Sequence, residues 1–150
     1  MSNRRRAREL VLHALYAMEL SKNSFDQVKQ DVIYNEKDSI ATIFFAEQLL
    51  LNAVNHIDEL DEMIKRKATN WDFTRIAIID KLILRMAICE FLYFDDIPPK
   101  VSIDEAIEIS KKYSTAKSGQ FINGILDAVL KELRHNNRLH KKGRGLIDGK

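Results

Sequence analysis

Apolar residues recur along this chain at the spacing of one face of a helix. The first such face follows a basic run and consists of Leu10, Val11, Ala14, Leu15 and Met18. The same periodicity continues almost to residue 134 and predicts about seven helices. Their expected ranges are 4–20, 24–34, 40–57, 57–68, 73–94, 102–113 and 118–133.

The distribution of glycine and proline decides the fold class. Residues 1–97 contain neither, the first glycine is Gly119, and the only prolines are Pro98 and Pro99. A β-rich domain of this size needs turn residues about every 8–12 positions, whereas helices need few breakers. The chain is therefore predicted to be all-α.

Polar residues mark two of the expected helix starts. Asp38 or Ser39 can cap the third helix, because each carries a side-chain oxygen suited to the first free backbone N–H groups. The Pro98-Pro99 pair excludes helix continuation there. Ser102 and Glu105 then have the spacing of a capping box, which predicts that the sixth helix begins at Ser102.

Charge is distributed unevenly behind a formal net charge of +2. Arg4, Arg5, Arg6 and Arg8 give the N-terminal arm +4, and residues 134–150 carry +5. Residues 9–133 then hold 14 of the 24 basic and 21 of the 22 acidic residues, a net charge of −7. Arginine forks suit phosphate, so the ends favour a nucleic acid and the acidic body a basic protein. A solvated basic terminus and solvated acidic helix faces are the alternatives.

The sequence offers little catalytic chemistry. Cys89 lies in an apolar stretch and is predicted to be a buried hydrophobe, and the four histidines are scattered without metal-ligand spacing. The acidic cluster Asp58, Glu59, Asp61 and Glu62 is interpreted as the solvent-exposed face of one helix. We therefore expect no enzymatic activity, no metal and no cofactor.

The length and apolar content of the chain limit how it can be organised into domains and where it can be located. No apolar run approaches the roughly 20 residues of a membrane span, which favours a cytoplasmic protein. The expected organisation is a helical domain over 1–135 and a basic, mobile tail over 136–150.

Two groups of residues could stack on unpaired bases. Tyr16 lies two turns beyond the arginines, near His13, and is either a stacking platform or a core residue with its hydroxyl at the rim. Phe121, beside Lys117 and Gln120, is either a stacking residue at a helix start or ordinary core.

Gly124 falls inside the periodicity of the last helix, where glycine costs about 1 kcal/mol relative to alanine. The close approach of another helix is the expected compensation.

These features together resemble the transcription antitermination factor NusB family. The matching segments are 4–10 (RRRAREL), 14–16 (ALY), Asp80, 84–87 (LRMA), Glu90, Pro98, 100–101 (KV), Ile103, 105–108 (EAIE), 111–113 (KKY) and 121–127 (FINGILD). The arginine run alone is weak evidence for this family. The whole set of segments in this order, especially 121–127, is specific to it.

The resemblance implies two small helical bundles sharing a core, without catalysis. It implies pairing with the ribosomal protein NusE and binding of single-stranded boxA RNA within an RNA polymerase antitermination complex that acts above all on ribosomal RNA operons. By position, the RNA contacts would be Arg4, Arg5, Arg6, Arg8, Phe121 and the neighbouring Lys117 and Gln120. Asp80 and Arg85 would lie toward NusE. Lys117 departs from the acidic residue that family members can carry there.

Three other functions remain open from sequence. The chain could be an RNA-binding domain that works with a separate ribosomal RNA methyltransferase, a helix-turn-helix protein that prefers duplex DNA, or a helical adaptor without nucleic-acid binding. Whether it is a monomer or a homodimer is also open.

Overall fold

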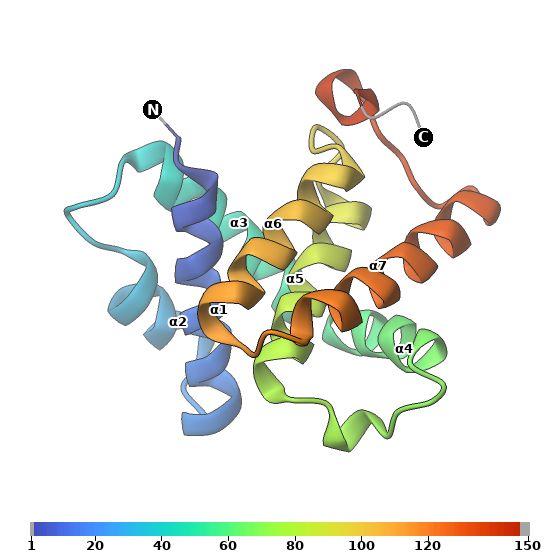
Figure 1. Ribbon diagram of the computed structural model, residues 1–150. Helices are drawn as coiled ribbons and strands as arrows, with labels where there is room; N and C mark the ends of the chain where they lie inside the picture. The colour runs from blue at the N-terminus through green and yellow to red at the C-terminus, as the bar shows by residue number, and fades with distance from the viewer. Residues whose placement is uncertain (1, 148–150) are drawn as a thin grey trace. The chain divides into compact units, whose positions relative to one another are not determined.

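The computed structural model describes residues 2–147, and within that range it contains helices and no strands (Figure 1). The seven expected α-helices are present, which confirms the all-α prediction. They divide into two compact units, Met1–Asn55 and His56–Lys150. These are called the N-terminal unit and the C-terminal unit below.

The N-terminal unit is built on two long helices that pack against each other, α1 (Arg4–Ser21) and α3 (Ile40–Asn55) (Figure 1). Between them lie α2 (Phe25–Val28) and a π-helical turn, η1 (Lys29–Ile33). The predicted apolar face of α1 is confirmed, since Leu10, Val11, Ala14 and Leu15 are buried. Ser39 caps α3, because its Oγ accepts a hydrogen bond from the Thr42 backbone N–H at 3.1 Å.

The C-terminal unit is organised around α5 (Ile78–Tyr93), which packs against α4 (Ile57–Lys67), α6 (Pro99–Tyr113) and α7 (Ser118–His135). Residues 82–91 of α5 are all buried. A helix that is buried all round must lie at the centre of its unit. Cys89 is among these residues, as predicted, and burial raises the pKa of its thiol.

Two predicted helix starts are wrong. The fifth helix begins at Ile78 and not near 73, because Asp72 caps a short 3₁₀ turn, η2 (Phe73–Arg75), and the backbone is extended at Ile76. The sixth helix begins at Pro99, whose fixed backbone angle suits a first helical position. Ser102 therefore lies inside the helix and makes no capping box with Glu105.

Two predicted side-chain environments are also wrong. Gly124 has no close helix beside it, since a Cβ built there would have nothing within 4 Å in the described structure. The acidic face of α4 is only partly solvent-exposed. Asp61 forms an ion pair with Arg85, and Glu59 accepts hydrogen bonds from Tyr93 and Arg138.

The chain after α7 contacts the C-terminal unit as far as it is described. The Lys141 Nζ donates to the backbone carbonyls of Glu90 at 3.0 Å and Phe94 at 2.6 Å, at the end of α5. A last 3₁₀ turn, η3 (Gly143–Leu146), follows. The mobility expected for residues 136–150 stays a prediction, and residues 148–150 lie outside the described part of the chain.

No single helix among the described residues is long and apolar enough to cross a membrane, and α3 with α4 meets that test only as a bent pair.

Candidate nucleic-acid interface

The start of α1 is fixed to its own unit and is not a free arm. The Asn3 side chain accepts a hydrogen bond from the Arg6 backbone N–H at 3.0 Å, which caps the helix. The Asn3 backbone N–H donates to the Oγ1 of buried Thr42 on α3 at 2.8 Å. The basic run is therefore anchored to a folded unit and is not a freely solvated terminus.

Helix geometry separates the four arginines. Arg4 and Arg5 are exposed, Arg6 is half-buried with its Nε 3.3 Å from Asp38, and Arg8 is only 4% exposed. The Arg8 guanidinium lies 5.4 Å from the centre of the Phe45 ring, against α3. Successive residues point about 100° apart on a helix, so a basic run cannot present all its members to one ligand. Arg8 serves packing in this structure, and its predicted RNA contact stays a prediction.

One face of α1 does gather three predicted residues. Arg5, His13 and Tyr16 are all exposed, and with Glu9 they follow the i, i+4, i+8, i+11 spacing of a single stripe. Tyr16 is 40% exposed and so is not a core residue. From Arg5 to Tyr16 the stripe extends about 16 Å along the axis at 1.5 Å per residue. We call Arg5, His13 and Tyr16 the α1 face.

The second predicted set lies in the C-terminal unit, at the start of α7. Lys117 and Phe121 line one pocket, of about 300 Å³, whereas Gln120 is exposed outside its lining. The Phe121 ring is half-buried and meets the Trp71 ring edge-on, with centroids 5.2 Å apart and planes at 72°. Phe121 is therefore neither fully exposed nor ordinary core.

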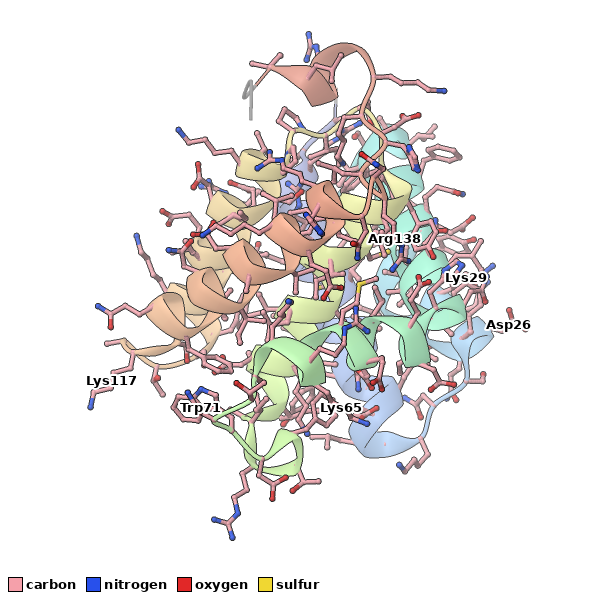
Figure 2. All side chains as sticks on the ribbon, turned by 90° about the vertical axis from the view of Figure 1, so that its right-hand side faces the viewer. Asp26, Lys29, Lys65, Trp71, Lys117 and Arg138 are labelled. Carbon is pink, nitrogen blue, oxygen red and sulfur yellow. The ribbon has the colours of Figure 1, made fainter. Side chains whose placement is uncertain are left out.

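Sequence reasoning missed Trp71 and Arg75, which line the same pocket. Both come from the segment between α4 and α5. In the sequence-based prediction, Trp71 lies between the expected helices 57–68 and 73–94, and Arg75 lies inside the second of them. The signal in the sequence that could have indicated Trp71 is that this tryptophan belongs to no predicted apolar helix face. Trp71 is 60% exposed, and Figure 2 shows it at the same edge of the unit as Lys117.

Asp80 and Arg85, the predicted partner-facing residues, are both buried with partners of their own. The Asp80 carboxylate accepts hydrogen bonds from Ser114 Oγ at 2.7 Å and Ser118 Oγ at 3.0 Å. The Arg85 guanidinium pairs with both oxygens of Asp61, at 2.6 and 2.9 Å. These contacts join α5 to α4, to the end of α6 and to the start of α7. Contact with a partner protein stays a prediction for both.

The described residues contain no group of three or more histidine, cysteine or acidic side chains placed to hold a metal ion. Each of the two surfaces presents basic side chains and accessible aromatic rings, along one helix stripe on α1 and around one pocket at the start of α7. This combination suits an unpaired nucleic-acid strand, because phosphates bind the cations and bases stack on the rings.

Comparison with known proteins identifies the family. The NusB family model matches residues 5–131. The chain is also 47% identical over 149 residues to the "Transcription antitermination protein NusB" of Chloroherpeton thalassium, covering 97% of this chain and 70% of the relative. The chain belongs to the NusB family. The protein of the same name from Thermodesulfovibrio yellowstonii is 43% identical, with 92% and 99% covered.

Solved structures of the NusB family share this fold. The NusB of T. maritima superposes with a TM-score of 0.82 at 35% identity, covering 88% of this chain and 94% of that one. A second structure, described as antitermination factors NusB and NusE in complex with double-stranded RNA, has a TM-score of 0.77 at 27% identity and covers 86% and 96%.

Proposed function

We propose that this protein is a transcription antitermination factor that binds boxA-type single-stranded RNA together with NusE and has no catalytic role. The observation that carries the proposal is family membership over nearly the whole chain, combined with the solved NusB–NusE pair on RNA. It would act in the cytoplasm within an RNA polymerase complex, above all on ribosomal RNA operons.

The proposed RNA surface has two parts. The α1 face supplies Arg5, His13 and Tyr16, and the start of α7 supplies Lys117 and Phe121. Arg4 is also exposed, but its guanidinium lies 4.6 Å from the centre of the Phe45 ring, on the side of α1 that Arg8 shares. Single strands are proposed over duplexes because accessible rings gain binding energy only from bases that are not already stacked and paired. The solved pair holds double-stranded RNA, so strandedness is one of the points to test.

The proposed partner surface lies on the acidic body of the chain, whose net charge of −7 over residues 9–133 complements a basic ribosomal protein. Asp80 and Arg85 would act on this surface indirectly. Because both are buried and hydrogen-bonded, they would hold the neighbouring helices in place for NusE rather than touch it.

The test is a binding measurement with labelled RNA. Fluorescence anisotropy of a boxA strand is titrated with this protein alone, with NusE alone and with both, and compared with a scrambled strand, an RNA duplex and a DNA duplex. We expect the protein and NusE together to bind the boxA strand more tightly than either alone and more tightly than the other three nucleic acids. Equal affinity for scrambled RNA, or preference for duplex DNA, would contradict the proposal.

A further inference from the structure

The pocket at the start of α7 has features that the general RNA surface does not need. It encloses about 300 Å³, at the lower end of the range for small-ligand sites, which suits one flat ring system. It lies wholly within the C-terminal unit. Its lining is Trp71, Arg75, Ile76, Ala77, Asp80, Thr115, Lys117, Ser118 and Phe121.

Two aromatic rings meet here at an angle. Trp71 and Phe121 have planes at 72°, so together they form two sides of a notch. The contact between the two rings is T-shaped, and 60% of the Trp71 residue surface remains exposed. A third ring could therefore stack on the indole while its own edge faces Phe121, an arrangement that aromatic groups favour.

The segment that carries Trp71 is held on both sides. The Phe73 ring contacts two ammonium groups, those of Lys65 on α4 and Lys81 on α5, which lie 4.9 and 4.5 Å from its centre. Asp72 accepts hydrogen bonds from the Thr74 hydroxyl and backbone N–H, which lower the pKa of its carboxyl. The Trp71 backbone N–H also donates to the Ala68 carbonyl at 3.0 Å. The backbone that carries the indole is therefore held before any ligand arrives, which reduces the entropy lost on binding.

The far side of the pocket is equally fixed. Asp80 accepts from Ser114 and Ser118, and those two hydroxyls lie 2.7 Å apart. This network holds the loop that carries Lys117 against the start of α5. Both walls of the pocket are thus formed by anchored segments.

Charge orients a nucleotide in this pocket. The carboxylate of Asp80 is among the lining residues, so a phosphate inside would be repelled. Lys117 and Arg75, both exposed, supply positive charge at the surface instead, although the Arg75 Nε lies 3.9 Å from the Asp72 carboxylate, which offsets part of its charge. The favourable placement is a base inside and its phosphates outside, beside Arg75 and Lys117.

We propose that this pocket binds a single unpaired base of the RNA, stacked on Trp71, with Phe121 against its edge. The inference rests on the proposed function and extends it to a base-binding residue, Trp71, that lies outside the predicted site. It makes Trp71 the principal stacking surface of the C-terminal unit.

The chain contains one tryptophan, Trp71, so the indole fluorescence of this protein comes from the pocket alone. The boxA strand, with NusE present, is titrated while indole emission of this protein and anisotropy of the labelled RNA are recorded together. NusE is replaced by a tryptophan-free variant if it contributes emission. We expect indole emission to fall along the same curve as the anisotropy rises. Because the wild-type protein is used, the result does not depend on a variant folding.

A second measurement locates the base. Abasic nucleotides are placed one at a time along the strand, and affinities are measured for wild type, Trp71→Ala, Trp71→Phe and the control Phe44→Ala. Phe44 is 63% exposed on α3 and lies outside both surfaces. At one position, the abasic strand should bind wild type and Phe44→Ala roughly 5- to 150-fold more weakly than the intact strand. The same replacement should have almost no effect with Trp71→Ala and a reduced effect with Trp71→Phe.

The outcomes separate the two proposals. Tight RNA binding with unchanged indole emission, or abasic penalties that are equal in wild type and Trp71→Ala, would overturn the base pocket and leave the proposed function standing. Absence of RNA binding by the protein with NusE would overturn both.

Discussion

Arg5→Ala and Arg8→Ala should affect different properties of the protein, although both arginines belong to the same basic run. Arg5 is exposed on the α1 face, whereas Arg8 is 4% exposed and packed beside Phe45. The first change should weaken RNA binding and lower stability less than the second. The second should lower stability.

The size of the Arg5 effect follows from counterion release. If Arg4, Arg5, Arg75 and Lys117 each neutralise one phosphate, the log–log salt dependence of a single strand has a slope of about −2.8. Affinity should then fall roughly 50-fold between about 50 and 200 mM salt. Arg5→Ala should reduce the slope to about −2.1 and weaken binding about 5-fold near 0.1 M salt.

The size of the Arg8 effect follows from burial. Truncation removes the stacked guanidinium and the packing of its stem, which should lower the free energy of unfolding by about 1–3 kcal/mol. For a chain of this length, that is a Tm lower by roughly 3–10 °C.

The assay pairs anisotropy titrations at several salt concentrations with thermal unfolding of each variant. Arg144→Ala is the matched control, because it removes an exposed arginine from the C-terminal segment and so reports the effect of net charge alone. A salt slope unchanged by Arg5→Ala would refute the assignment of RNA to the α1 face. A slope reduced equally by Arg144→Ala would show that the effect of Arg5→Ala is not specific to that face. An unchanged Tm for Arg8→Ala would refute its packing role.

Three further predictions concern the C-terminal unit. Gly124→Ala should raise the free energy of unfolding by up to about 1 kcal/mol in denaturant titrations, since the added methyl meets nothing within 4 Å, and a loss would show a contact missing from this account. Lys141→Ala should lower the free energy of unfolding by about 1–2 kcal/mol, because it removes the two hydrogen bonds to the end of α5. The neighbouring Lys142 side chain is 81% exposed, so Lys142→Ala should change that free energy little. Equal losses for the two variants would contradict this prediction. Hydrogen bonding to Arg66 lowers the pKa of Glu132 from 4.5 to about 2, so its stabilising contribution is complete above pH 4.5 and is lost as pH falls through 2. Glu132→Gln should therefore cost about 1 kcal/mol at pH 7 after solvent screening, a difference that disappears toward pH 2, and a difference independent of pH would be inconsistent with the ion pair.

The helical architecture could be predicted from sequence because it depends on local periodicity. The start of α7 at Ser118 follows directly from regular apolar spacing. The starts of α5 and α6 could not be placed in this way. For α5, Asp72 caps the separate η2 turn, so the helix begins only at Ile78. For α6, the Ser102 hydroxyl donates to the Glu90 carboxylate on α5, a contact that the sequence does not reveal, and the helix begins earlier, at Pro99.

The candidate site was predictable only in part, for a related reason. Composition revealed the arginines, but not that helix rotation buries Arg8 while exposing Arg5. Similarly, Asp61 has the pattern of a solvated residue until Arg85, 24 positions later, is brought against it. Trp71 joins Phe121 across 50 positions, and no periodicity connects a loop with a helix start.

The central claim is that RNA lies on the α1 face and in the pocket formed by Trp71 and Phe121. Its most direct test is photo-crosslinking of a boxA strand carrying 4-thiouridine to the protein bound with NusE, followed by mass spectrometry of the crosslinked peptides. The account predicts crosslinks at Tyr16 or its neighbours on α1 and at Trp71 or Phe121. Crosslinks confined to other surfaces, such as the segment after α7, would contradict it.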